Sequence, residues 1–246
     1  YFIRNALKIK YSNYEIVVVD NGSSDNSIDF LEKNFSEISL IKLGKNYGYA
    51  AGFNKGINYA INKGAEYILI TSNDVVLHRD IIKEGVKLAE TNDRIGYLGG
   101  KVFDLNTNRK FQYAGGRFML DNRLTPSRGR GEYDNGQYED VEYFDFMDDV
   151  CVLVKSRMVE EIGAYDDDFF FDWEEAEWNS RIINSGYKIV YNPKMLAWHR
   201  KHGSTSGSRY HYLPEKYHWR GKLLFYYKTR KNTDNFEFFF LSFFFF

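Results

Sequence analysis

Short apolar runs that end in polar residues are the feature of this chain that most limits its fold. The first run, at residues 15–20, is rich in β-branched residues and closes with an acid, which is typical of a buried strand in a parallel sheet. Strand and helix patterns then alternate, with strands expected at 15–20, 40–43 and 67–71 and helices at 24–35, 50–61 and from residue 80 onward. This order predicts an α/β fold with a central, mostly parallel sheet flanked by helices.

Polar side chains follow each of these predicted strands. Asp20 and Asn21 follow the first strand, Asn46 follows the second, and Asn73 and Asp74 follow the third. Ligands of open α/β sheets bind outside the carboxyl ends of the strands. The five side chains therefore form a candidate binding site.

The turn after the first strand has the composition of a nucleotide contact. Asp20 can accept hydrogen bonds from a nucleobase or a ribose, and Gly22 and Ser23 would let the backbone come close to a ligand. A purely structural turn from strand to helix would have the same composition. The phosphate-binding patterns GxxxxGK[ST] and GxGxxG are absent from the sequence.

Two residues suggest a metal ion. Asp74 ends the Ser72, Asn73, Asp74 turn, and its carboxylate is a suitable ligand for a divalent cation. His199 follows a later apolar run, and an imidazole beside a carboxylate is typical of sites for Mn²⁺ and similar ions. Each residue also has a simpler interpretation, because an aspartate can cap a turn and a histidine can pack at the end of a strand.

The second half of the chain carries a different pattern. We expect a long polar loop at 121–137, a strand at 150–154, helices at 156–162 and 173–185, and a final strand at 188–199. No linker is evident before about residue 229. The sequence therefore predicts one domain, residues 1–228, followed by an aromatic and basic tail at 229–246.

Composition excludes several classes of protein. The formal net charge is −1, so the chain lacks the basic field of a nucleic-acid-binding protein. Cys151 is the single cysteine, which excludes an internal disulfide and favours a cytoplasmic location. The Phe-rich end is shorter than the roughly 20 apolar residues that span a bilayer. With Lys228, Arg230 and Lys231 before it, this end could contact the inner face of a membrane or be covered by a partner.

Four carboxylates occur together in the segment FFFDWEEAEW at residues 169–178. If Asp172 is the N-cap of a helix, Glu175 occupies the third helical position and can close a capping box. Arg181 lies on the side of that helix where it can neutralise Glu174 or Glu177. Glu175 points elsewhere, and the helix dipole is expected to keep it ionised near pH 7. An ionised carboxylate with room for a hydroxyl is a candidate general base.

Five segments of the chain resemble the family 2 inverting glycosyltransferases, especially the rhamnosyltransferase-like branch. They are VVVDNGSSDNS, GKNYGYAAGFNKGI, LITSNDVVL, VCVLVKSRMVEEIGAYDDDFFFDWEEAEWNSRIINSGYKIVYNP and AWHRKHGST, in the order of the family. The resemblance implies an A-type glycosyltransferase fold, a nucleotide-diphospho-sugar donor, a divalent metal (Mn²⁺ or Mg²⁺) and a glycan or lipid-linked acceptor. It also implies a role in cell-surface polysaccharide synthesis, with the family's first strand expected before Tyr1.

The resemblance further implies roles for individual residues. Those on the nucleotide side are Asp20, Asn21, Gly22, Ser23, Asn46, Gly48, Asn54 and Asn73. Those of the metal site are Asp74 and His199. Those of the catalytic group are Glu175, which matches the general base, Glu174 before it and Arg181 after it.

Three positions depart from the family pattern. Glu175 stands where the family usually has Asp, Ser72 replaces the first acid of the metal motif, and Asp149 stands where a small residue is common. A binding-only relative that has lost its chemistry is therefore one alternative. A sugar nucleotidyltransferase, which shares a nucleotide-binding α/β fold and a metal, is another.

Overall fold

The computed structural model describes residues 1–246 except 108, 118, 121–122, 125, 201–211 and 230–246. Its helices are α1 (Phe2–Ala6), α2 (Ser27–Asn34), α3 (Tyr49–Asn62), α4 (Ile81–Ala89), α5 (Ser156–Ile162), α6 (Glu174–Asn184) and α7 (Tyr212–Thr229). Its strands are β1 (Ile16–Asp20), β2 (Ile38–Lys42), β3 (Tyr67–Thr71), β4 (Val75–Leu77), β5 (Ile95–Asp104), β6 (Phe111–Ala114), β7 (Met119–Leu120), β8 (Arg123–Leu124), β9 (Glu142–Phe144), β10 (Cys151–Lys155) and β11 (Lys188–His199). The predicted alternation of strands and helices is confirmed, with boundaries within three residues of those expected.

The main sheet has seven strands, in the order β3-β10-β5-β11-β4, with β6 paired to β5 and β9 paired to β11. Strands β5 and β11 are parallel, whereas β10 lies antiparallel between β3 and β5. The α/β fold class is confirmed, but the sheet is mixed rather than mostly parallel. The chain leaves β5 through antiparallel β6 and a long excursion, and it enters β10 at the edge where β3 and β5 end.

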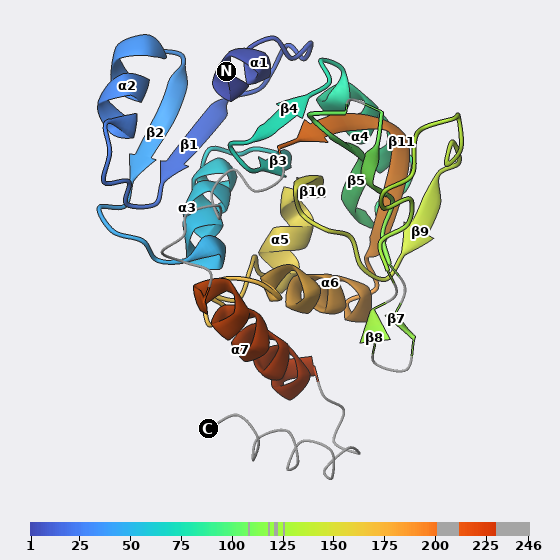
Figure 1. Ribbon diagram of the computed structural model, residues 1–246. Helices are drawn as coiled ribbons and strands as arrows, with labels where there is room; N and C mark the ends of the chain where they lie inside the picture. Colours follow the sequence, from blue (N-terminus) through green and yellow to red (C-terminus); the bar gives the residue numbers. More distant parts are fainter. Residues whose placement is uncertain (108, 118, 121–122, 125, 201–211, 230–246) are drawn as a thin grey trace.

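Strands β1 and β2 form a separate parallel pair, connected by α2. This pair lies beside the main sheet in Figure 1, and α3 contacts both β1 and β3. Thr71, at the end of β3, pairs with Cys151, at the start of β10. The Ser72 to Asp74 turn and the residues before β10 therefore lie at the same edge of the main sheet.

Helices cover both faces of the main sheet. Leu98 and Leu153 belong to the core on the side of α4, whereas the adjacent Tyr97 and Val152 belong to the core on the side of α3, α5 and α6. This division follows from the alternation of side chains along each strand. Trp178 of α6 is fully buried on the face covered by α3, α5 and α6. Its ring is nearly perpendicular to that of Tyr97, at a centroid distance of 5.7 Å.

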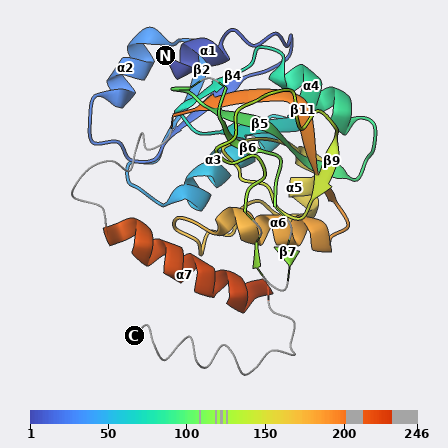
Figure 2. The same ribbon diagram turned by 45° about the vertical axis from the view of Figure 1, so that its right-hand side comes forward.

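Helix α7 packs against α6 in both views (Figures 1 and 2). Phe225 of α7 is buried in a small cluster with Phe146, Phe169 and Ala176. The predicted domain end at residue 228 falls inside α7, and residues 230–246 of the predicted tail lie outside the described residues. In the part of the chain that the structure describes, no helix combines the length and the apolar character that crossing a membrane requires.

The loop before α3 is held against the segment before α6. The Tyr49 N–H donates to the Phe170 carbonyl at 2.6 Å, and Gly48 adopts a φ of +92°. A Cβ at Gly48 would lie 2.5 Å from the Phe170 oxygen, so a side chain does not fit there. This close approach joins the predicted nucleotide loop to the start of the acidic helix.

We expect Gly48→Ala to lower the Tm more than Gly44→Ala, a matched change in the same loop. Gly44 also has a positive φ, +75°, but nothing lies within 4 Å of a Cβ added there. Both variants place an alanine at a positive φ, which costs on the order of 1–3 kcal/mol. Only Gly48→Ala adds a steric clash, which costs about 1–3 kcal/mol more. Thermal unfolding of both variants measures the difference, and equal losses would contradict the close contact.

Candidate active site

A tight turn follows β1 and contains four of the predicted nucleotide residues. Asp20 is buried, and its Oδ2 accepts hydrogen bonds from the N–H groups of Gly22 and Ser23, both at 3.2 Å. Gly22 has a φ of +83°, and a Cβ there would lie 2.4 Å from the Lys45 backbone. The turn therefore lies directly against the 44–48 loop.

Asn21 joins this turn to the loop. Its Nδ2 donates to Asn46 Oδ1 at 3.2 Å and to the Gly48 carbonyl at 2.8 Å, and its Oδ1 accepts from the Tyr47 N–H at 3.0 Å. Asn46 Oδ1 also accepts from the Gly48 N–H at 2.8 Å. The structure thus brings together six of the predicted nucleotide residues: Asp20, Asn21, Gly22, Ser23, Asn46 and Gly48.

The other two predicted nucleotide residues have different surroundings. The Asn54 Nδ2 donates to the Tyr165 carbonyl at 2.8 Å and to Asp167 Oδ1 at 2.6 Å, while Asn54 Oδ1 accepts from the Tyr165 N–H at 3.1 Å. Asn54 therefore holds α3 against the segment before α6. Asn73 is exposed in the turn after β3, next to Asp74.

The two predicted metal ligands lie against each other. β4 pairs with the end of β11, and His199 Nε2 lies 3.3 Å from Asp74 Oδ1. The same oxygen accepts a hydrogen bond from the Ser72 hydroxyl at 2.7 Å. Two ligands about 2.1 Å from one ion lie about 3.0–3.4 Å apart at octahedral or tetrahedral angles, so this pair fits a shared divalent cation.

These two ligands would not fill a coordination sphere by themselves. Across the described ranges, no group of three or more His, Cys, Asp or Glu side chains could hold a metal ion. Mg²⁺ and similar ions are commonly held by one or two protein ligands together with water and substrate phosphates. Asp74 and His199 therefore suit a cation that arrives with a phosphorylated substrate.

Helix α6 does not begin with the predicted Asp172 cap. Trp173 is the N-cap residue, and Asp172 and Trp173 both adopt the left-handed conformation, with φ of 71° and 73°. The Asp172 carboxylate is instead bound to α7, since its Oδ2 lies 2.6 Å from His218 Nδ1. The predicted capping box is wrong, because Glu175 is at the second helical position and its partner is engaged elsewhere.

Glu174 and Glu175 follow this cap in a poorly hydrated, acidic environment. Glu174 is 4% exposed, and its Oε2 has no hydrogen-bond partner in the described part of the chain. Burial, and then the charge of Asp149, raise the pKa of Glu174 to about 8. Burial, and then the charge of Glu174, raise the pKa of Glu175 well above its usual range. This burial opposes the helix dipole, on which the prediction of an ionised Glu175 rests.

Asp149 is the third acid of this buried group. Its Oδ1 accepts a hydrogen bond from the Tyr49 hydroxyl at 3.1 Å, and its Oδ2 accepts one from the Tyr165 hydroxyl at 2.7 Å. Burial raises the pKa of Asp149 to about 6 despite these two hydrogen bonds. Tyr49 begins α3, so Asp149 connects the predicted nucleotide loop with the acids of α6. From the sequence, Asp149 is marked only by its departure from the family pattern.

Arg181 makes its contacts away from Glu175. Its Nε and Nη2 donate to the two carboxylate oxygens of Glu177 at 2.6 and 2.8 Å, so the predicted ion pair with Glu177 is confirmed. Its Nη1 and Nη2 also donate to the carbonyls of Ile162 and Ala164 at 2.6 and 2.5 Å. Arg181 therefore joins the end of α5 to α6, and these contacts do not support a catalytic role for it.

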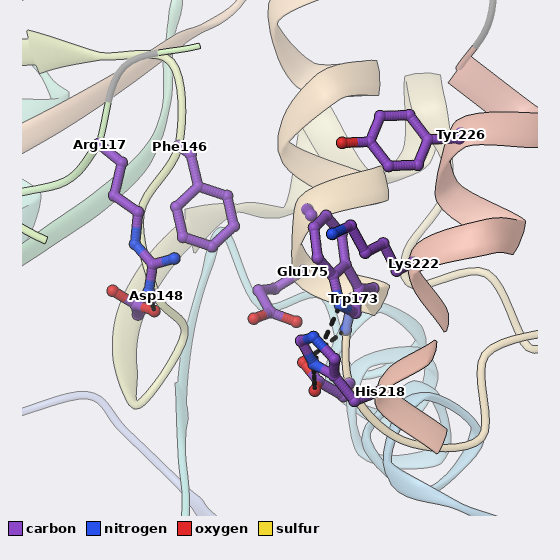
Figure 3. A pocket seen from close by; sticks show the side chains of 10 residues that line it. Arg117, Phe146, Asp148, Trp173, Glu175, His218, Lys222 and Tyr226 are labelled. Carbon is purple, nitrogen blue, oxygen red and sulfur yellow. Dashed lines mark hydrogen bonds and ion pairs between the residues drawn. The ribbon is translucent and has the colours of Figure 1, made fainter. Parts of the chain in front are cut away.

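Glu175 lines a cavity of about 530 Å³ between α6, α7 and the segment before β10, and Figure 3 shows its carboxylate among the lining side chains. Residues 218, 222 and 226 of α7, spaced by four, present one face to the cavity. The remaining charged and aromatic lining residues are Arg117, Phe146, Asp148, Asp172 and Trp173. The contributions of α7 could not be found by motif, because they depend on how that helix packs.

The chain matches the profile of glycosyl transferase family 2 over residues 1–163, which is more than half of its 246 residues. It belongs to this family, as the sequence predicted. The match includes Asp74 and the turns after β1 and β2, and it ends before α6.

Two curated relatives extend this comparison. The dTDP-rhamnosyl transferase RfbF of Shigella flexneri is 27% identical over 202 residues, which are 79% of this chain and 63% of that protein. The poly-beta-1,6-N-acetyl-D-glucosamine synthase of Staphylococcus aureus is 22% identical over 204 residues, which are 80% of this chain and 45% of that protein. The chain thus spans less than two thirds of the length of either relative.

A solved structure shares the fold. The mannosyltransferase PcManGT from Pyrobaculum calidifontis, in complex with GDP-Man and Mn²⁺, aligns with a TM-score of 0.60 at 15% identity. The alignment covers 92% of this chain and 58% of PcManGT. The predicted A-type glycosyltransferase fold is confirmed.

We expect Glu174→Gln to stabilise the protein, and more at pH 9 than at pH 5. Folding raises the pKa of Glu174 from its ordinary 4.5 to about 8, so the folded state binds more protons between these values. The free energy of unfolding therefore falls as pH rises through this window, and a neutral glutamine removes that loss. A gain of about 1 kcal/mol at pH 9 would raise the Tm by roughly 2–4 °C. Thermal unfolding at both pH values is the measurement, and an equal shift at both would contradict the raised pKa.

Proposed function

We propose that this chain moves a sugar from a nucleotide-diphosphate donor to a hydroxyl of a glycan or lipid-linked acceptor, with inversion at the anomeric carbon. The observation that carries the proposal is Glu175, which projects from the first turn of α6 into a cavity with charged and aromatic walls. Family membership supports the reaction class, and the two curated relatives support a role in cell-surface polysaccharide synthesis. A cytoplasmic location suits the free thiol of Cys151.

We assign the donor nucleotide to residues 20–23 and 46–48, which Asn21 joins into one surface. Asp74 and His199 would hold Mn²⁺ or Mg²⁺. A cation bound there would supply positive charge beside the departing diphosphate. The complex of PcManGT with GDP-Man and Mn²⁺ supports this combination of donor and metal.

Glu175 is the general base of the proposed reaction. Its carboxylate takes the proton of the acceptor hydroxyl while the hydroxyl oxygen attacks the anomeric carbon. The bond from that carbon to the phosphate oxygen breaks, and the nucleoside diphosphate leaves with the electron pair. The raised pKa makes the ionised Glu175 a stronger base than an ordinary glutamate. Attack opposite to the leaving group inverts the anomeric carbon.

We assign the cavity between α6 and α7 to the acceptor. Trp173 and Tyr226 line it with rings that can lie against the apolar face of a sugar. Arg117 and Lys222 bring hydrogen-bond donors for hydroxyl or anionic groups. Arg117 is held in place by its ion pair with Asp148 at 2.7 Å, which favours a fixed acceptor geometry.

Glu175→Gln is expected to lower turnover about 10²–10⁴-fold, because an amide cannot take the acceptor proton. Donor binding should stay nearly intact, since residue 175 lies outside the proposed nucleotide surface. The measurement is release of nucleoside diphosphate with Mn²⁺ and a panel of UDP-, GDP- and dTDP-sugars, repeated with EDTA. Glu160→Gln, an exposed glutamate on α5, is the matched control. Near-normal turnover in Glu175→Gln would show that Glu175 is not the general base.

The pH profile of kcat/KM tests the same base by another route. Its acid limb should lie well above the ordinary pKa of a glutamate, because burial and neighbouring acids raise the pKa of Glu175. Glu174→Gln removes one of these negative charges and should move the limb toward lower pH. We would record the profiles of both proteins under saturating Mn²⁺. An acid limb that does not move would show that the titrating group is not Glu175.

A binding-only relative is the second candidate. The observation that favours it is the raised pKa of Glu175, because a carboxyl that keeps its proton cannot act as a base. A Tm rise with nucleoside diphosphate and Mn²⁺, without turnover of any donor, would support this candidate. The sugar nucleotidyltransferase alternative is set aside, because the chain belongs to glycosyl transferase family 2.

A further inference from the structure

The imidazole of His199 is held on both of its nitrogens. Nε2 lies 3.3 Å from Asp74 Oδ1, and Nδ1 lies 2.7 Å from Oε1 of Gln112. Gln112 is on β6 and is 8% exposed. β6 and β11 both pair with the last residues of β5, which brings Gln112 and His199 together from distant parts of the sequence.

The amide of Gln112 can take only one orientation in this contact. Its Nε2 donates to the backbone carbonyl of His199 at 2.9 Å, and a carbonyl oxygen can only accept. The amide nitrogen is therefore on the backbone side, and the amide oxygen faces the ring. Because Oε1 has no proton to give, the 2.7 Å contact requires a proton on His199 Nδ1.

We infer that Gln112 is a positioning residue, which accepts the Nδ1 proton of His199 and so fixes the ring with Nε2 directed at Asp74. This inference rests on the proposed function only in giving Nε2 a divalent cation to bind. At 3.3 Å, Nε2 and Asp74 Oδ1 can share a proton, or a divalent cation in its place. Hydrogen bonds of this kind to the outer nitrogen orient metal-binding histidines in other proteins.

The test separates this role from simple packing by comparing two substitutions. Gln112→Glu keeps an oxygen that accepts the Nδ1 proton, so it should keep the tautomer. Gln112→Leu removes that acceptor at similar volume. Gln137→Leu is the matched control, because Gln137 also bonds to backbone groups, at Tyr133 and Asn135, but belongs to the 131–140 loop.

The first measurement is the tautomer itself. Long-range ¹H–¹⁵N spectra of ¹⁵N-histidine-labelled protein at pH 8, without metal, report which ring nitrogen carries the proton, and there are only 5 histidines to assign. We expect a proton on Nδ1 in the wild type, in Gln112→Glu and in Gln137→Leu, and a mixed or Nε2–H form in Gln112→Leu. A wild-type ring without a proton on Nδ1 would overturn the inference, even if Gln112→Leu fails to fold.

The second measurement is Mn²⁺ affinity, from the loss of the free-ion electron paramagnetic resonance signal in the presence of nucleoside diphosphate. Gln112→Leu should bind Mn²⁺ about 10–100-fold more weakly than the wild type. Gln112→Glu and Gln137→Leu should stay within a few-fold of it. Equal Mn²⁺ affinity and an unchanged tautomer in Gln112→Leu would overturn the inference and leave the proposed function standing. The tautomer could depend on Gln112 while the protein binds no Mn²⁺. That result would support the inference and contradict the metal site of the proposed function.

Discussion

The segment before α6, residues 164–173, is held by hydrogen bonds from α3 and α7, and the whole candidate site depends on it. The Asn54 side chain on α3 bonds to the backbone of Tyr165, near the start of the segment. The Tyr49 N–H, also on α3, donates to the Phe170 carbonyl. Lys228 on α7 contacts Asp166 and Asp168, both at 2.5 Å. Because the segment is fixed at these points, α6 begins at Glu174, and Glu175 of its first turn meets the cavity.

The same arrangement concentrates negative charge where water is scarce. Asp149 precedes β10 whereas Glu174 and Glu175 begin α6, and burial raises the pKa of each. Buried acids that repel one another reduce stability, and they are typical of functional sites. Arg181 and Glu177, one turn further along α6, show the ordinary solution, in which a buried carboxylate is neutralised by a bidentate arginine. In the described part of the chain, Asp149, Glu174 and Glu175 have no arginine partner of this kind.

Much of the fold could be predicted from the sequence because it depends on local periodicity. β3, α5 and β11 occupy the predicted residues, since the apolar patterns of strands and helices act over a few neighbours. The order of the strands in the sheet could not be predicted in this way. β10 enters between β3 and β5 only after an excursion of more than 40 residues, and its direction depends on where that excursion ends.

The sequence by itself determined the family, the alternation of strands and helices, and the residue types of the candidate site. Each of these depends on short motifs of residues that are neighbours in the sequence. Only the tertiary structure decided which of those residues meet. It gave Asn54 and Arg181 packing roles, took Asp172 from its predicted cap to His218, and brought Gln112 to His199 across 87 positions. It also raised the pKa of the buried acids, because a pKa depends on hydration and on charges that lie close in space but far apart in the chain.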